Sequence, residues 1–102
     1  MTDTALTLLL VLSAALFAVG LFGLTARRTL LFQLLALEIM LTGPALAFVA
    51  AGARHGAPEG QGMFVLVLTL AAAEVAVGLA LYLRLRRVAG TQDADALTRL
   101  KG

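Results

Sequence analysis

The sequence contains no cysteine and only one histidine, His55. The absence of cysteine excludes disulfide bonds, cysteine-held iron–sulfur clusters, thiolate zinc sites and thiol chemistry. A single histidine cannot build a metal site alone, and no glycine-rich nucleotide-binding motif occurs. We therefore expect this chain to bind neither a metal nor a redox cofactor, and we look for its function among the few charged residues that it has.

Charge is also scarce. Only 14% of the 102 residues are charged, 61% are hydrophobic, and the mean hydropathy is +0.97. Soluble domains are about 25% charged and about 45–50% apolar. A chain this short has too little interior to hide so much apolar surface from water. The sequence therefore predicts a membrane protein, and we expect no binding to nucleic acid from its net charge of +2.

Three apolar stretches are long enough to cross the bilayer, at residues 5–26, 30–53 and 63–83. Crossing about 30 Å of hydrocarbon takes about 20 helical residues, and backbone groups in lipid must be satisfied within each span. The first stretch is too long for a signal peptide and lacks a basic start. We predict an all-α membrane protein, one domain over residues 1–102, with a turn-rich connection at residues 54–62 and a polar tail at 84–102.

Basic residues predict the orientation of these spans. One side of the membrane receives seven of the eight Lys and Arg residues. These seven are Arg27, Arg28, Arg84, Arg86, Arg87, Arg99 and Lys101. The other side receives only Arg54. Cytoplasmic loops carry the excess of Lys and Arg, so the N-terminus is expected outside and the C-terminus in the cytoplasm.

Two sets of small residues recur at four-residue spacing: Gly43, Ala47 and Ala51 in one, and Ala72, Ala76 and Ala80 in the other. Such stripes let helices approach closely in lipid, against each other or against other subunits. Alanine is also common throughout this chain, so the spacing has a second, incidental interpretation.

The second and third spans each contain one acidic residue, Glu38 and Glu74. Placing a charged side chain at the centre of a membrane helix costs roughly 2.5–3.5 kcal/mol on insertion scales. At 1.5 Å per residue, Glu38 lies about 12 Å beyond Leu30, and Glu74 about 13–14 Å before Leu83. Both carboxyls are therefore expected at nearly one depth, as a lateral proton path requires. The alternative is a pair of neutral glutamates that hydrogen-bond to neighbouring helices.

The surroundings of the two glutamates differ in sequence. Ala71 and Gly78 lie one turn from Glu74 and leave room for water or a partner helix. Near Glu38 the only hydroxyl belongs to Thr42, and Pro44 is expected to kink the second helix. His55 and Glu59 are interpreted as solvated loop residues.

Several segments together resemble a known family: residues 20–24 (GLFGL) before Arg27 and Arg28, residues 37–41 (LEIML), residues 45–48 (ALAF), residues 60–61 (GQ), residues 71–79 (AAAEVAVGL) and residues 95–102 (DALTRLKG). The chain resembles subunit K of the bacterial proton-pumping NADH:quinone oxidoreductase, respiratory complex I, whose mitochondrial counterpart is subunit 4L. The departure from the family pattern is Gly43-Pro44, where no proline is expected.

The resemblance implies a three-helix subunit of the bacterial cytoplasmic (inner) membrane that binds no redox cofactor. NADH, FMN, Fe–S clusters and quinone would be bound by other subunits. Its neighbours would be subunit J and the antiporter-like pumping subunits. Glu38 and Glu74 would belong to the hydrated proton relay, and Arg27 and Arg28 would support it from a cytoplasmic loop.

Two other functions are compatible with the same spans. One is the small subunit of a multisubunit Na⁺/H⁺ antiporter, which performs secondary transport. The other is a structural or pore-forming small membrane protein such as a holin, for which both glutamates would be dispensable. A rotor subunit of ATP synthase fits poorly, because that fold has two helices and one carboxyl.

Overall fold

A computed structural model describes residues 2–89 and 93–94 of the chain. These residues form three α-helices, α1 (Asp3–Ala26), α2 (Leu30–His55) and α3 (Glu59–Ala89), in the order expected from the sequence. Each helix is long and apolar enough to cross a membrane. The expected fold class, an all-α membrane protein with three spans, is confirmed. Most of the predicted polar tail, residues 90–92 and 95–102, lies outside the described residues.

The helix ends follow local capping chemistry. Thr2 caps α1, because its hydroxyl accepts a hydrogen bond from the Ala5 amide at 3.1 Å. At the other end of α1, the Gln33 side-chain amide donates to the carbonyl of Arg27 at 2.9 Å. The α2 helix ends at Gly56, whose φ of 63° is the left-handed conformation that glycine adopts readily. These groups satisfy backbone donors and acceptors where the helices begin and end.

The helices are longer than the spans predicted from hydropathy. Only residues 56–58 separate α2 from α3, so most of the expected loop at 54–62 is helical. His55 and Glu59 accordingly lie at helix ends, where both are exposed. The α3 helix also continues past Leu83 to Ala89, through three arginines. Hydropathy predicts which residues lie in the hydrocarbon of the bilayer. The helices extend beyond those residues, because helical backbone hydrogen bonds continue into the polar interface.

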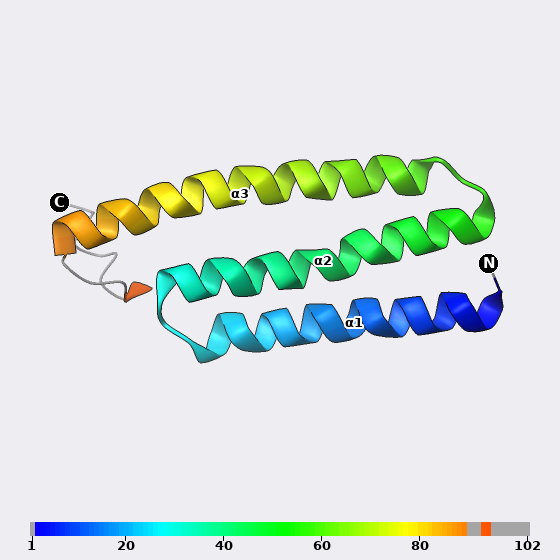
Figure 1. The fold of residues 1–102 in the computed structure, drawn as a ribbon, viewed down its shortest axis with the longest axis horizontal. Helices are drawn as coiled ribbons and strands as arrows, with labels where there is room; N and C mark the ends of the chain where they lie inside the picture. Colours follow the sequence, from blue (N-terminus) through cyan, green and yellow to red (C-terminus); the bar gives the residue numbers. More distant parts are fainter. Residues whose placement is uncertain (1, 90–92, 95–102) are drawn as a thin grey trace.

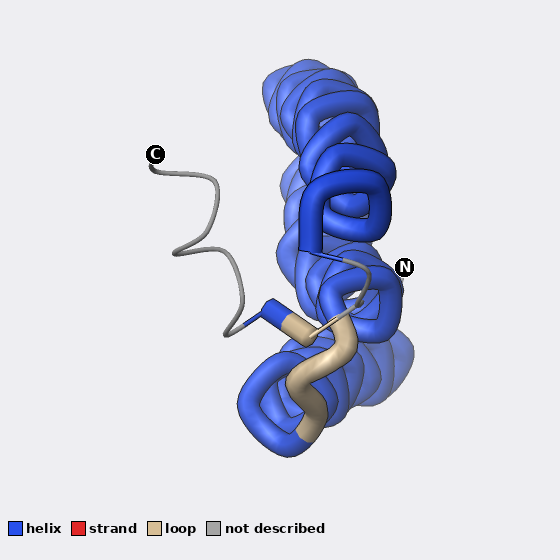
Figure 2. Tube along the Cα trace, turned by 90° about the vertical axis from the view of Figure 1, so that its left-hand side faces the viewer, coloured by secondary structure: helices blue, strands red, loops and turns tan. Residues whose placement is uncertain are grey.

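The three helices form a single layer with α2 in the middle. Figure 1 shows α1 and α3 on opposite sides of α2, and the end view in Figure 2 shows the helices in one row. The principal extents of 53 × 24 × 14 Å fit this flat arrangement. A single layer leaves both broad faces uncovered, so the chain exposes many large apolar side chains. Lipid or neighbouring membrane helices must cover these faces.

Glycines set the spacing between the helices. A Cβ atom added to Gly20 of α1 would collide with the backbone of Met40 in α2. Gly43 lies equally close to the Ser13 carbonyl, and Gly78 of α3 lies against the Leu34 side chain. In contrast, Ala72, Ala76 and Ala80 are exposed, so that stripe makes no close contact within the described chain. Of the two predicted stripes, only the one that begins at Gly43 includes such a close contact.

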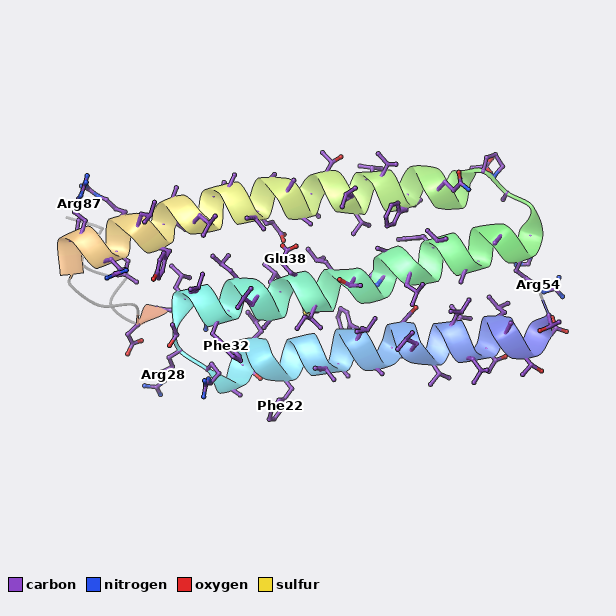
Figure 3. The ribbon with its side chains drawn as sticks, in the orientation of Figure 1. Phe22, Arg28, Phe32, Glu38, Arg54 and Arg87 are labelled. Atoms are coloured by element: carbon purple, nitrogen blue, oxygen red, sulfur yellow. The ribbon has the colours of Figure 1, made fainter. Side chains whose placement is uncertain are left out.

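The basic side chains separate the two ends of the layer as the sequence predicts. Figure 3 shows Arg28 and Arg87 at one end and Arg54 at the other. We call the first the arginine-rich end; it contains Arg27, Arg28, Arg84, Arg86 and Arg87. At the opposite end, Arg54 forms an ion pair with Asp3 at 2.6 Å, which joins the end of α2 to the start of α1. Because both partners are exposed, this pair adds little stability.

Candidate functional site: two carboxyls between α2 and α3

The register of α2 and α3 places the two glutamates at the same level. Leu34 of α2 packs against Gly78 of α3, and Gly52 packs against Gly60. Because the helices are antiparallel, each step forward along α2 corresponds to one step backward along α3. Four residues on from Leu34 is Glu38, and four residues back from Gly78 is Glu74. The equal depth expected from the sequence is therefore a property of the folded helices.

Glu38 faces the interface with α3. It lines a cavity of about 120 Å³ between the two helices, and Figure 3 shows its side chain in the space between them. The other lining residues are apolar except for one threonine: Leu41, Thr42, Ala45, Phe64, Val67, Leu68 and Ala71. This volume exceeds the roughly 10–15 Å³ of probe-occupied space that one water molecule needs. A carboxyl group that is otherwise surrounded by apolar side chains thus opens onto a small space at mid-depth.

Glu74 lies on the face of α3 that packs against α2. Ala71 and Gly78 lie one turn to either side of it on the same face. Ala71 lines the cavity between the two helices, and Gly78 packs against Leu34 of α2. The Glu74 side chain is half-buried, and its Oε2 atom is buried without a hydrogen-bond partner in the described part of the chain. Leaving a buried polar atom unpaired costs about 1–3 kcal/mol. The atom is thus suited to accept a hydrogen bond from an internal water molecule.

The polar groups expected near Glu38 are present, but they do not bind its carboxylate. The Thr42 hydroxyl donates a hydrogen bond to the backbone carbonyl of Glu38 at 2.8 Å. Pro44 lies inside α2, where it removes the backbone donor that would reach the carbonyl of Met40. Figure 1 shows a change of direction near the middle of α2. The proline kink therefore falls beside the Glu38 cavity, between the lining residues Thr42 and Ala45, and next to the Gly43 contact with α1.

The arginines predicted to support the site lie apart from it, at the membrane surface. Arg27 and Arg28 are both exposed in the connection between α1 and α2. The guanidinium of Arg27 lies 4.6 Å from the centre of the Phe32 ring, a cation–π contact. Because Glu38 is about 12 Å deeper along α2, these arginines and the carboxyls are not brought into direct contact.

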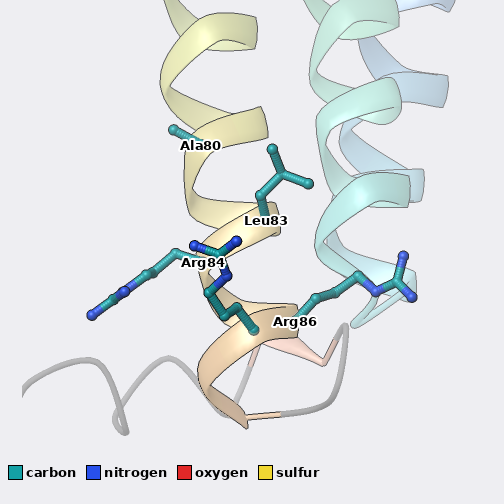
Figure 4. A pocket seen from close by; sticks show the side chains of 5 residues that line it. Ala80, Leu83, Arg84 and Arg86 are labelled. Atoms are coloured by element: carbon teal, nitrogen blue, oxygen red, sulfur yellow. The ribbon is translucent and has the colours of Figure 1, made fainter.

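A second group of arginines lies at the end of α3. Figure 4 shows Arg84 and Arg86 with Leu83 and Ala80 around a surface pocket of about 600 Å³. Arg86 also lies 5.9 Å from the ring centre of Tyr82. Positive side chains at a helix C-terminus interact favourably with the helix dipole. These residues anchor the arginine-rich end at the membrane surface.

Sequence reasoning located both carboxyls but missed part of their surroundings. The α3 residues that close the cavity, Phe64, Val67 and Leu68, carry no signal beyond apolarity. Gln33, which binds the end of α1, is an isolated amide in an apolar span and was a recognisable signal. Within the described residues, no cluster of three or more His, Cys, Asp or Glu side chains is arranged to hold a metal ion.

Comparison with known proteins identifies close relatives over the whole length. The sequence model of the family described as NADH-ubiquinone/plastoquinone oxidoreductase chain 4L matches residues 8–102. The chain is 64% identical to NADH-quinone oxidoreductase subunit K of Rhodopseudomonas palustris strain BisB5, and the comparison covers 100% of both chains. It is 68% identical to the protein of the same name from strain TIE-1, again over 100% of both chains. Subunit K of Ectopseudomonas mendocina strain ymp is 52% identical, over 91% of each chain.

Proposed function

The chain belongs to the NADH-ubiquinone/plastoquinone oxidoreductase chain 4L family, and we propose that its two level carboxyls form part of the proton relay of that enzyme. It is a membrane subunit of the NADH-quinone oxidoreductase complex, complex I, and its partners include other subunits of that complex. The relay role is the further step, and it concerns Glu38 and Glu74.

One observation carries the proposal: both carboxyls lie at one depth on the facing sides of α2 and α3, and Glu38 lines a cavity large enough for water. Proton transfer needs donors and acceptors within hydrogen-bond reach or linked through one water. A carboxyl in this setting can take up a proton from one neighbour and release it to the next.

The unpaired Oε2 of Glu74 extends the same argument. A glutamate that served only to hold the helices together would bind a partner within its own chain. Glu74 instead has one oxygen buried between the helices, to which an internal water molecule can donate a hydrogen bond. This arrangement fits a water-linked relay between α2 and α3, which we propose continues into subunit J and the antiporter-like subunits.

The arginines have two proposed roles. Arg27 and Arg28 hold the arginine-rich end on the cytoplasmic side of the bacterial inner membrane, with the N-terminus outside. We also propose that their positive charge supports the relay from the cytoplasmic side. Their distance from the carboxyls makes this support long-range, so their loss should impair pumping less than loss of either glutamate.

The redox chemistry is assigned to other subunits. We propose that NADH, FMN, Fe–S clusters and quinone bind outside this chain, and that the chain performs no hydride or electron transfer. The support is its residue content, which includes no cysteine and one histidine. Its contribution to the enzyme is then confined to proton movement inside the membrane.

The alternatives considered from the sequence are less well supported. The matching relatives are named as subunits of NADH-quinone oxidoreductase, which does not favour the Na⁺/H⁺ antiporter subunit. A purely structural or pore-forming protein would need no carboxyls at matched depth on facing helices. Purification in mild detergent together with flavin-containing and Fe–S-containing subunits distinguishes the proposed enzyme from both alternatives.

The relay is tested by changing Glu38 or Glu74 to alanine in the assembled complex. Quinone-linked NADH oxidation and proton pumping are measured in membrane vesicles. We expect both variants to lose most coupled activity, with aspartate at either position less severe because it retains a carboxyl. Glu59→Ala is the matched control, since this exposed glutamate lies on α3 outside the proposed relay. Full coupled activity in both alanine variants of the relay positions would refute the proposal.

A further inference from the structure

A second cavity lies on the other side of α2, in a groove between α1 and α2. Its volume is about 780 Å³, within the range of about 300–1,000 Å³ that is usual for ligand sites. The floor is formed by small residues: Gly23 approaches Ala36 so closely that an added Cβ would lie 3.1 Å from the alanine Cβ. Bulky apolar side chains form the walls, including Phe22, Phe32 and Ile39.

The groove has one charged end. Arg27 lines it at the arginine-rich end, and the contact with the Phe32 ring, at 4.6 Å, holds the guanidinium there. The other lining residues are apolar. Figure 3 shows Phe22 and Phe32 in the half of the molecule nearer to that end. The groove thus combines apolar walls at membrane depth with a positive group at the membrane surface.

The length of the groove indicates what fills it. Along α1 it runs from Val19 to Arg27, which is eight residues or about 12 Å. A partner transmembrane helix would need a contact surface along about 30 Å of hydrocarbon. A groove of less than half that length, which begins in the bilayer and ends at a cation, matches one leaflet and therefore one lipid.

We propose that this groove binds a phospholipid with an anionic headgroup, in the leaflet at the arginine-rich end. An acyl chain would lie over Gly23 between Phe22 and Ile39, and Arg27 would bind the phosphate. Arginine suits this task, because its planar guanidinium binds phosphate oxygens in pairs. The site is separate from the proposed relay, since it lies between α1 and α2 and not between α2 and α3.

The test uses the assembled complex in membranes and two lipid probes that carry a diazirine in the acyl chain. One probe is a phosphatidylglycerol and the other a phosphatidylcholine, and adducts on this chain are located by mass spectrometry. We expect adducts on residues 19–39 that form in higher yield with the phosphatidylglycerol. Equal adduct yields from the two probes would overturn the proposal. The absence of adducts in the groove, as expected if another subunit covers it, would also overturn it. Neither outcome requires a substitution in the chain.

Two variants test the charge and the shape separately. Arg27→Gln should lower the phosphatidylglycerol yield about fivefold, the effect typical of one basic residue at an anionic surface, whereas Arg27→Lys should retain most of it. Val19→Trp should fill the groove and remove adducts from both probes. Val11→Trp is the control, because Val11 lies on the same helix with matching exposure, 61% against 60%. An Arg27→Gln yield equal to that of the unchanged chain would contradict the phosphate contact.

Discussion

At the scale of single residues, the two glutamates lie at the same depth along the helices but have different surroundings. Glu38 opens onto a cavity, whereas Glu74 is packed beside Gly78 with one buried, unpaired oxygen. The sequence was sufficient to identify both residues, because an acidic side chain in an apolar span is conspicuous. It was insufficient to show their different burial, which depends on helix rotation and on the side chains of the facing helix.

Glu74→Leu separates a relay role from a packing role. Removing a buried oxygen that has no partner should cost little stability, because no hydrogen bond within the described chain is lost. We therefore expect the complex to assemble in normal amount and with unchanged thermal stability, while proton pumping is lost. The measurements are the yield of purified complex and its unfolding temperature.

Gly78→Leu is the matched comparison for that variant. It lies one turn away on the same face, but the larger side chain would collide with Leu34. Overpacking of this kind typically costs about 1–3 kcal/mol, so we expect reduced assembly. If Glu74→Leu impaired assembly as severely as Gly78→Leu, the glutamate would be serving as a packing residue.

At the scale of helices, the decisive property is the register between α2 and α3. Apolar length predicted where the helices lie in the chain, and small residues indicated that they approach closely. The sequence singled out Gly78 beside Glu74, but it did not identify Gly60 as a contact glycine, and the alanine stripe on α3 appeared equally suitable for close packing. The helices also extend beyond the predicted apolar spans, since only residues 56–58 make the turn between α2 and α3.

Cross-linking tests the register, and the lack of native cysteine makes the experiment clean. The double variant with Leu34→Cys and Gly78→Cys should form a disulfide. The Cγ of Leu34 lies 3.0 Å from a Cβ built on Gly78, so the two β-carbons are close enough for a disulfide bond. Leu34→Cys with Ala76→Cys should not, since Ala76 is exposed. Mobility shifts on non-reducing gels report the outcome, and efficient cross-linking of the control pair would disprove the register.

At the scale of the whole molecule, the chain is one layer of helices whose two ends differ in positive charge. The unequal distribution of Lys and Arg predicted this division, and the structure gathers Arg27, Arg28 and the α3 arginines at one end. The single-layer arrangement could not be read from the sequence, because apolar residues occur on every side of each helix. That pattern suits a subunit whose two broad faces meet lipid or other membrane subunits.

Thiol labelling in intact cells tests the proposed orientation. His55→Cys should react with a membrane-impermeant reagent added outside, because His55 is exposed at the end opposite the arginines. Val88→Cys, exposed on α3 at the arginine-rich end, should react only after the cells are made permeable. The reverse pattern would place the arginine-rich end outside and invert the orientation.

The most direct test moves a carboxyl by one turn and asks whether the relay recovers. In a Glu74→Ala background, Ala71→Glu places a new carboxyl at the Glu38 cavity, whereas Ala72→Glu places one on an exposed side of α3. Protons pumped per electron are measured in vesicles for both double variants. Recovery of pumping with Ala71→Glu but not with Ala72→Glu is the predicted result. Equal recovery from both positions, or undiminished pumping in Glu74→Ala alone, would contradict a relay between α2 and α3.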